Sequence, residues 1–203
     1  MRKLIYRIAL CLLAAVLISA GALLADRQTL RDSLIRFHVV ANSDSEEDQR
    51  IKLLVRDAVL QSIQEDLASV ADVEQARAYL RQNLPKIQTI ANSVLEAAGF
   101  EEEAVVSLCQ EAFDTRDYDT FSLPAGVYEA LRIVIGEGEG HNWWCVSFPA
   151  LCLGATREAF SDTALEAGLS PKLTETLKAD TDYALRFFLL DTIGRIENSI
   201  FMR

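Results

Sequence analysis

The spacing of apolar residues changes once along the chain, close to Gly99. Between residues 46 and 98, apolar positions recur every three or four residues, which predicts helices. From residue 104 to 148 they alternate, and an earlier run at residues 34–40 alternates as well, which predicts strands. We therefore expect an α+β fold, in which an N-terminal strand and helices precede an antiparallel sheet and a C-terminal helix.

Polar residues mark where the predicted helices begin. A capping box, made by Ser43 with Glu46 or by Asp44 with Glu47, would start the first helix after the N-terminal strand. Acidic residues in this first turn favour the positive end of the helix. Asp72 is expected to cap the second helix.

Proline and glycine predict where other helices end or begin. Pro85 should break or restart the second helix, and Gly99 should end it. Ser170-Pro171 predicts the cap and first residue of a later helix. The last segment keeps helical spacing, although residues 183–189 also alternate, so an initial strand there stays open.

Two alternating runs, residues 128–135 and 143–148, flank a glycine-rich connection. Gly136, Gly138 and Gly140 allow the positive φ angles that tight turns require. Runs of period two on both sides of such a connection predict a β-hairpin. Because the glycines lead into a strand and are interleaved with two glutamates, a phosphate-binding loop is not expected.

The tip of this hairpin is the first candidate for function. Aromatic and polar side chains crowd beside the glycines, namely His141, Asn142, Trp143 and Trp144. Such groups on a projecting loop are typical of protein recognition. Because strand side chains alternate, only one of the two Trp residues should face outward. The competing interpretation is that both Trp residues pack in the core.

The N-terminus has the order of an export signal. Residues 1–7 are short and basic, residues 8–24 carry no charge, and the small residues 20–22 fit a signal-peptidase site. The apolar run is long for a cleaved signal and slightly short for a spanning helix, so cleavage and anchoring both stay open. We expect residues 1–25 to be a signal peptide or membrane anchor and residues 26–203 to form one extracytoplasmic domain.

The folded part of the chain is strongly acidic. The sequence holds 20 basic and 30 acidic residues, a net charge of −10, and no acidic residue precedes Asp26. Such a domain is repelled by nucleic acid and by anionic lipid headgroups. We expect no nucleic-acid partner, and contact with a membrane only through the N-terminal segment.

Three cysteines follow the leader, so at least one cannot pair within the chain. A Cys145–Cys152 disulfide is favoured. A Cys109–Cys145 pair and three reduced, buried thiols remain alternatives.

The cysteines and histidines do not form a catalytic set in the sequence. A hydrolase would use Cys145 as nucleophile with His141 or His38 as base, but an extended strand would hold His141 roughly 13 Å from Cys145 at about 3.3 Å per residue. The residues show no metal-ligand spacing and no cofactor motif. The sequence predicts a binding protein, not an enzyme, with an exported hydrolase based on Cys145 or on the Glu137/Glu139 pair as the alternative.

Two dense stretches resemble the stage II sporulation protein R family. The first is LIRFHVVANSDSEEDQ at residues 34–49, followed by KLLVRDAV at residues 52–59. The second is PAGVYEALRIVIGEGEGHNWWCVSFP at residues 124–149, in which the run GHNWWC is the specific part. The resemblance extends from residue 34 to about residue 152, and Ala150 departs from it where a second proline is expected.

The resemblance implies a signalling protein of endospore formation. Members of the family are made in the forespore and exported into the space between the forespore and the mother cell. There they trigger a membrane-embedded aspartic protease, which removes the pro-sequence of sigma factor E. By this resemblance the chain is the ligand of the protease, and no cofactor or metal is implied. The candidate contacts with this partner are Gly136, Glu137, Gly138, Glu139, Gly140, His141, Asn142, Trp143 and Trp144, together with His38, Asn42 and Asp44.

Overall fold

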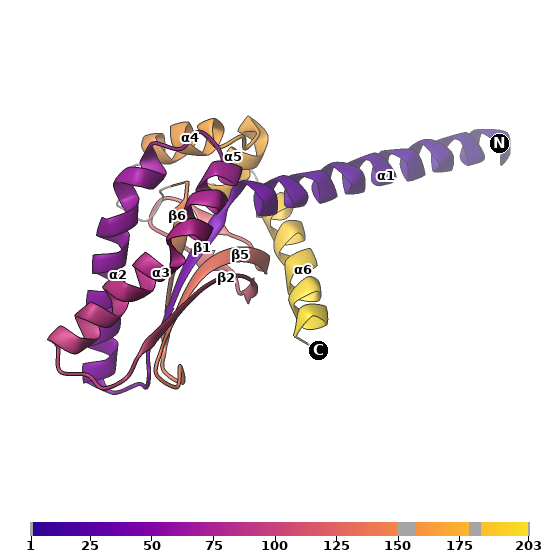
Figure 1. Ribbon diagram of the computed structural model, residues 1–203. Helices are drawn as coiled ribbons and strands as arrows, with labels where there is room; N and C mark the ends of the chain where they lie inside the picture. The colour runs from indigo at the N-terminus through magenta and orange to yellow at the C-terminus, as the bar shows by residue number, and fades with distance from the viewer. Residues whose placement is uncertain (1, 150–156, 179–183, 203) are drawn as a thin grey trace.

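The computed structural model describes residues 2–149, 157–178 and 184–202, which form a mixed α+β fold (Figure 1). The helices are α1 (Arg2–Ser33), α2 (Glu46–Ala68), α3 (Val73–Ala97), α4 (Arg157–Glu166), α5 (Pro171–Leu177) and α6 (Ala184–Phe201). The strands are β1 (Ile35–Val40), β2 (Ala104–Phe113), β3 (Arg116–Asp117), β4 (Ser122–Leu123), β5 (Gly126–Ile135) and β6 (Asn142–Phe148). The predicted α+β class is confirmed, with an N-terminal strand and helices before the sheet and a helix at the C-terminal end, but the sheet is mixed and not antiparallel.

The main sheet has four strands in the order β2-β5-β1-β6 and is mixed. β1 runs parallel to β5 and antiparallel to β6, and β2 runs antiparallel to β5. The predicted hairpin is therefore wrong, because β1 lies between β5 and β6. All six residues of β1 are buried, and a strand buried on both faces is more stable inside a sheet than at its edge. The glycine-rich connection is long enough to cross one intervening strand.

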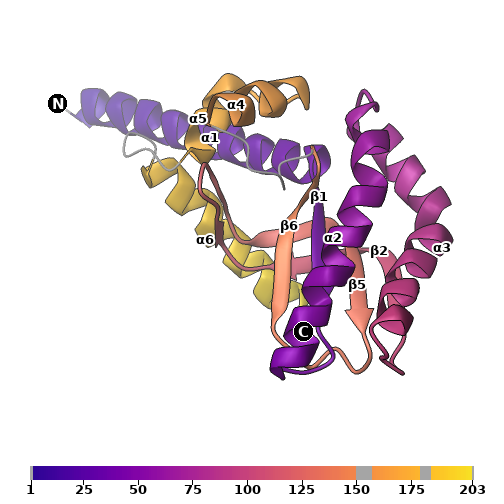
Figure 2. The ribbon, with the colours of Figure 1, turned by 90° about the vertical axis from the view of Figure 1, so that its left-hand side faces the viewer.

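Helices cover both faces of the sheet, as Figure 2 shows. On one face α2 and α3 close a core around Phe37, Val39, Leu131 and Ile133. The opposite face carries α6 and, at one end, α4, α5 and the last turns of α1. Because side chains alternate along each strand, neighbouring residues of β1 and β6 contribute to different layers.

Helix caps confirm part of the prediction and correct part of it. Ser45 caps α2, since its side-chain oxygen accepts a hydrogen bond from the Asp48 amide at 3.0 Å, so neither predicted capping box forms. Asp72 caps α3 as predicted, and Gly99 follows the end of that helix with φ of +78°. Ser170 caps α5, with Pro171 at its start. From Ala184 onward the last segment is helical and not a strand.

Pro85 does not interrupt α3, contrary to expectation. A proline inside a helix removes one hydrogen bond and strains the preceding turn. Here the residue is exposed, so water can reach the carbonyl left without a donor. Leu80 and Ile87, on either side of it, are both buried in the same core, and this packing holds the helix continuous.

The N-terminal helix α1 runs from an exposed apolar half into the folded domain (Figure 1). By length and composition, its Lys3–Ser33 segment qualifies as a membrane span, a test that a signal sequence also passes. Its last turns belong to the domain, where Leu30 is buried and the Arg27 guanidinium donates to the Ala125 and Leu190 carbonyls at 3.4 and 3.2 Å. Arg27 also forms an ion pair with Glu197 of α6.

Candidate protein-recognition site

Two loops interlock at one end of the sheet, and we call them the loop pair. The first is residues 41–45, between β1 and α2, and the second is residues 136–141, between β5 and β6. The Gly140 amide donates to the Ala41 carbonyl at 3.0 Å, and the Glu139 amide donates to the Asn42 carbonyl at 3.1 Å. The side-chain oxygen of Asn42 accepts from the Glu137 amide at 3.0 Å. The glycine-rich loop therefore crosses the end of β1 and is held there by hydrogen bonds to its backbone amides.

Close contact between the loops explains two of the glycines. A Cβ atom at Gly140 would lie 2.2 Å from the Ser43 carbonyl oxygen, which is fixed backbone. A Cβ atom at Gly136 would lie 2.3 Å from the Asn42 side-chain oxygen, and Gly136 also has φ of +55°. These glycines thus allow the second loop to pack closely against the first. The sequence had instead predicted a free hairpin tip.

His141 and Asp44 join the two loops on the surface. The Asp44 Oδ1 atom lies 2.5 Å from both the backbone amide and the imidazole Nδ1 of His141. These hydrogen bonds, that of the imidazole first, hold the pKa of the Asp44 carboxyl below its ordinary value. Both side chains remain open to a partner, with His141 82% and Asp44 54% exposed.

Three side chains of α2 support the loop pair from beneath. The Asp48 carboxylate accepts from the Ser43 hydroxyl at 2.5 Å and from Asn42 at 3.1 Å, and the Ser43 hydroxyl contributes most to lowering the pKa of Asp48. The Lys52 ammonium donates to the His141 carbonyl at 2.8 Å, and burial lowers the pKa of Lys52. Gln49 donates to the Ser43 carbonyl at 3.0 Å.

Sequence reasoning did not select these supporting residues. All three belong to the first stretch that carries the family resemblance: Asp48 and Gln49 lie in residues 34–49, and Lys52 opens the run that follows at residues 52–59. A lysine is rarely buried without a partner. The position of Lys52 between apolar residues of the predicted helix was therefore the one sequence feature that could have indicated a polar contact there.

The rim of the loop pair is acidic. Glu137 and Glu139 are exposed on the second loop, and Glu46 and Glu47 are exposed at the start of α2. The Lys52 ammonium donates to the His141 carbonyl and is buried, and the exposed Arg50 lies 3.9 Å from Glu47. A partner with a basic surface would meet a complementary potential here.

The two Trp residues lie on opposite faces of the sheet, as predicted, and both are half-buried. Trp143 packs edge-on against Phe37 at 5.7 Å between ring centroids, and the Arg56 guanidinium covers its ring at 4.9 Å. Trp144 stacks on His38 at 5.5 Å, and the Arg116 guanidinium lies 3.3 Å over its ring. Each Trp thus has a packing role beside any contact with a partner.

His38 is buried inside the sheet. It is 4% exposed, and its Nδ1 atom lies 2.7 Å from a Glu111 carboxylate oxygen. Glu111 in turn pairs with Arg132 at 3.2 Å. Of the predicted contact residues, the structure therefore brings Asn42, Asp44 and residues 136–141 together in the loop pair. It places residues 142–144 in β6 and His38 in β1.

Cys145 cannot act as the nucleophile of a hydrolase in this structure. It is disulfide-bonded and 4% exposed, whereas Cys11 and Cys109 are free. Cys145 also pairs with Phe37, so its side chain lies on the opposite face of the sheet from His38. The predicted partner, Cys152, lies outside the described residues. Within residues 2–149, 157–178 and 184–202, no group of three or more metal-ligating side chains comes together.

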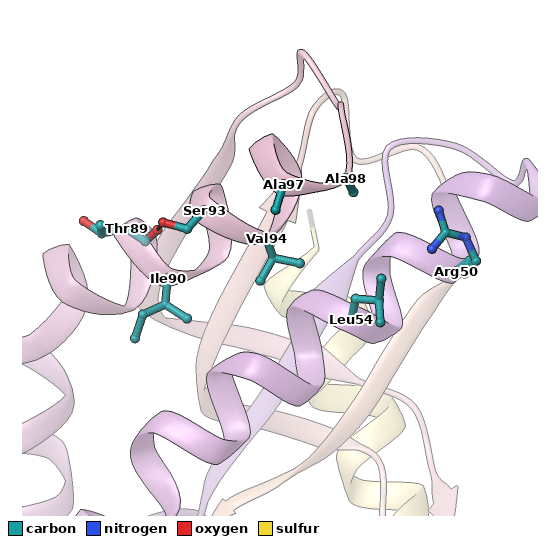
Figure 3. A pocket seen from close by; sticks show the side chains of 8 residues that line it. All are labelled: Arg50, Leu54, Thr89, Ile90, Ser93, Val94, Ala97 and Ala98. Carbon is teal, nitrogen blue, oxygen red and sulfur yellow. Dashed lines mark hydrogen bonds between the residues drawn. The ribbon is translucent and has the colours of Figure 1, made fainter.

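An open groove of about 670 Å³ lies between α2 and α3 (Figure 3). Its sides are formed near the start of α2 and the end of α3 by Arg50, Leu54, Thr89, Ile90, Ser93, Val94, Ala97 and Ala98. The first loop of the pair leads directly into α2, and the Gly136 amide bonds to the Glu103 carbonyl just beyond α3. The groove and the loop pair therefore occupy the same end of the molecule.

These features define an α+β domain with two interlocked surface loops, carried on an apolar N-terminal helix. The family profile described as Stage II sporulation protein R matches residues 31–158, and the chain belongs to this family. The Stage II sporulation protein R of Bacillus subtilis (strain 168) is 41% identical over 121 residues, which cover 60% of this chain and 54% of that protein. The chain thus spans about half the length of this curated relative. No solved structure matches it. Family membership supports a role in sporulation.

Proposed function

We propose that this chain is an exported signalling protein of sporulation that activates a membrane-embedded aspartic protease, leading to processing of the pro-form of sigma factor E. The loop pair is the surface that the protease recognises. The observation that carries the proposal is that the two stretches resembling the family, although almost a hundred residues apart, meet in one ordered and exposed structure through His141 and Asp44. An ordered loop has little conformational entropy left to lose on binding.

The surroundings of the loop pair favour a protein partner. Its acidic rim suits a basic surface, and the groove between α2 and α3 adds apolar contact area at the same end of the domain. The apolar α1 fits export by signal peptide or anchor. It leaves the domain on the α6 side of the sheet, and α2 and α3 cover the other side (Figures 1 and 2). The groove would then face away from the membrane of origin.

The proposal is tested by reconstitution of the full chain with the membrane protease and its pro-factor. The Glu137→Lys/Glu139→Lys double variant should lose activation at least tenfold, since like charges across an interface cost several kcal/mol. The matched control is Glu65→Lys/Glu166→Lys, which makes the same charge change at exposed positions near the end of α2 and on α4, away from the loops. Equal activation by the two variants would show that the partner binds elsewhere.

A further inference from the structure

Helix α6 exposes an apolar face that the fold leaves uncovered. Leu190, Gly194 and Asn198 point into the domain, where Leu190 and Asn198 are buried and a Cβ at Gly194 would strike the Ala125 carbonyl. The opposite face bears Leu185, Phe188, Leu189, Ile196 and Ile200, which are 72%, 60%, 42%, 58% and 70% exposed. Their spacing places all five on one side of the helix.

A helix with apolar residues on both faces normally has both faces covered. Contiguous exposed apolar patches on soluble domains usually mark a contact with a protein or a membrane. The polar residues between the five apolar ones are the small Thr192 and Ser199, and the charged residues of α6 lie toward its flanks. Apolar residues on two sides of α6 are typical of a helix that packs on both sides. In the isolated chain only one of these sides is covered.

The position of α1 indicates what covers this face. Asp26 and Arg27 on α1 form ion pairs with Arg186 and Glu197 on α6, and Arg31 adds a second pair with Glu197 at 2.7 Å. These contacts fix α6 against α1 immediately after its uncharged apolar stretch ends at Leu24. Figures 1 and 2 show α6 as the outer layer on the side of the sheet toward which α1 leaves the domain. The uncovered face and the apolar part of α1 therefore lie on the same side.

We propose that α6 lies on the surface of the lipid bilayer that α1 enters, with its exposed apolar face among the headgroups and upper acyl chains. Surface helices of this kind bury their apolar side about 5–10 Å deep. The attraction is apolar, because the domain as a whole is acidic and anionic lipids repel it. Membrane contact then extends beyond the N-terminal segment. With both α1 and α6 in contact with the bilayer, the domain has a fixed orientation relative to the membrane, which α1 alone would not provide.

The test measures the depth of residue 196 in a bilayer. The full chain is inserted into vesicles of phosphatidylethanolamine and phosphatidylglycerol with brominated acyl chains, which quench nearby Trp fluorescence. We expect Ile196→Trp to be quenched several-fold more than the parent chain, in which Trp143 and Trp144 lie in the sheet. Leu53→Trp, an exposed position on α2, serves as the matched control and should stay at the level of the parent.

Three results would overturn the proposal. The first is quenching of Ile196→Trp no greater than that of Leu53→Trp. The second is a change in the fluorescence of Ile196→Trp that depends on protein concentration but not on brominated lipid. This result would assign the face to a second copy of the chain. The third is failure of the full chain to float with the vesicles, which would remove α1 from the bilayer. Phe188→Trp provides a second position on the same face if Ile196→Trp does not fold.

Discussion

The Asp44 carboxylate accepts hydrogen bonds from both the amide and the imidazole of His141, across 97 residues of sequence. This contact holds the loop after β1 against the loop before β6. Since both side chains are largely exposed, the pair orders the surface more than it stabilises the core. The order of the loop pair is therefore the property to test first.

Acid should loosen the loop pair before it unfolds the domain. The pKa values of Asp44 and Asp48 both lie below the ordinary 3.8 in the folded chain. A depressed carboxyl pKa contributes stability above the unfolded value, and this contribution is lost as pH falls through the folded value. We expect the protection factors of the Gly140 and His141 amides, which compare their hydrogen exchange with the intrinsic rate at the same pH, to fall as pH is lowered below about 3.8. Asp44→Asn should raise this exchange already at pH 7, and an unchanged rate would contradict the role of the pair.

Asp48→Ala should destabilise the domain more than Asp44→Ala. Asp48 is buried and accepts from the half-buried Ser43 and Asn42, so its removal leaves these donors without this partner, at a cost of about 1 kcal/mol. Denaturant unfolding at pH 7 measures the difference. Glu47→Ala, an exposed change one residue earlier, is the control and should remain within about 0.5 kcal/mol of the parent.

Gly140→Ala should separate the two loops. Its Cβ would meet the Ser43 carbonyl at 2.2 Å, and the backbone shift this forces costs about 1–3 kcal/mol. Gly21→Ala is the comparison, because nothing lies within 4 Å of a Cβ there. Thermal unfolding of both variants checks the prediction, and equal melting temperatures would mean that the loops are not in contact.

Both Trp residues should contribute to the stability of the domain, whether or not they also contact a partner. Trp143→Ala uncovers Phe37, and Trp144→Ala uncovers His38, so both variants should lose stability, by less than the ~3–5 kcal/mol of a fully buried Trp. Unfolding free energies measured beside protease activation separate packing from contact. A variant that loses activation while keeping its full stability would make that Trp a recognition residue only.

Arg27→Ala should destabilise the domain, because Arg27 is buried and its loss leaves Glu197 without its inner partner. Breaking a buried ion pair costs about 3–5 kcal/mol, and the partial exposure of Glu197 places this case at the lower end. Arg31→Ala removes the outer, more exposed partner and should cost about 0–1 kcal/mol. Denaturant unfolding measures both losses, and a loss for Arg27→Ala as small as that for Arg31→Ala would contradict the anchoring of α1 in the fold.

The sequence predicted what depends on local pattern and missed what depends on distant pairing. The change of period near Gly99, the Asp72 cap and the Ser170 cap are local, and the structure has all three. The insertion of β1 between β5 and β6 is not local, because a glycine-rich connection looks the same whether it turns back or crosses a strand. Pro85 was misjudged because packing on both sides of it outweighs its own preference.

The candidate site was recovered in part for the same reason. Asn42, Asp44 and His141 carry polar groups that a strand or helix does not need, so they were visible in sequence. Asp48 and Lys52 were hidden because their polar partners come from the loops above them. The burial of His38 could not be read from the sequence, because it follows from the central place of β1 in the sheet.

The central place of β1 also sets the order in which the chain can fold. Arg36 pairs with Ala130 on one side and with Val146 on the other, so the earliest strand in sequence needs the two latest strands before it has neighbours. Pairing across such a separation is slow, because the connecting chain must first be closed. If the chain is exported through a membrane starting from its N-terminus, the sheet cannot form before β5 and β6 have crossed. The chain would therefore stay unfolded while it is exported. The loop pair would then assemble only on the far side of the membrane, after β6 has emerged.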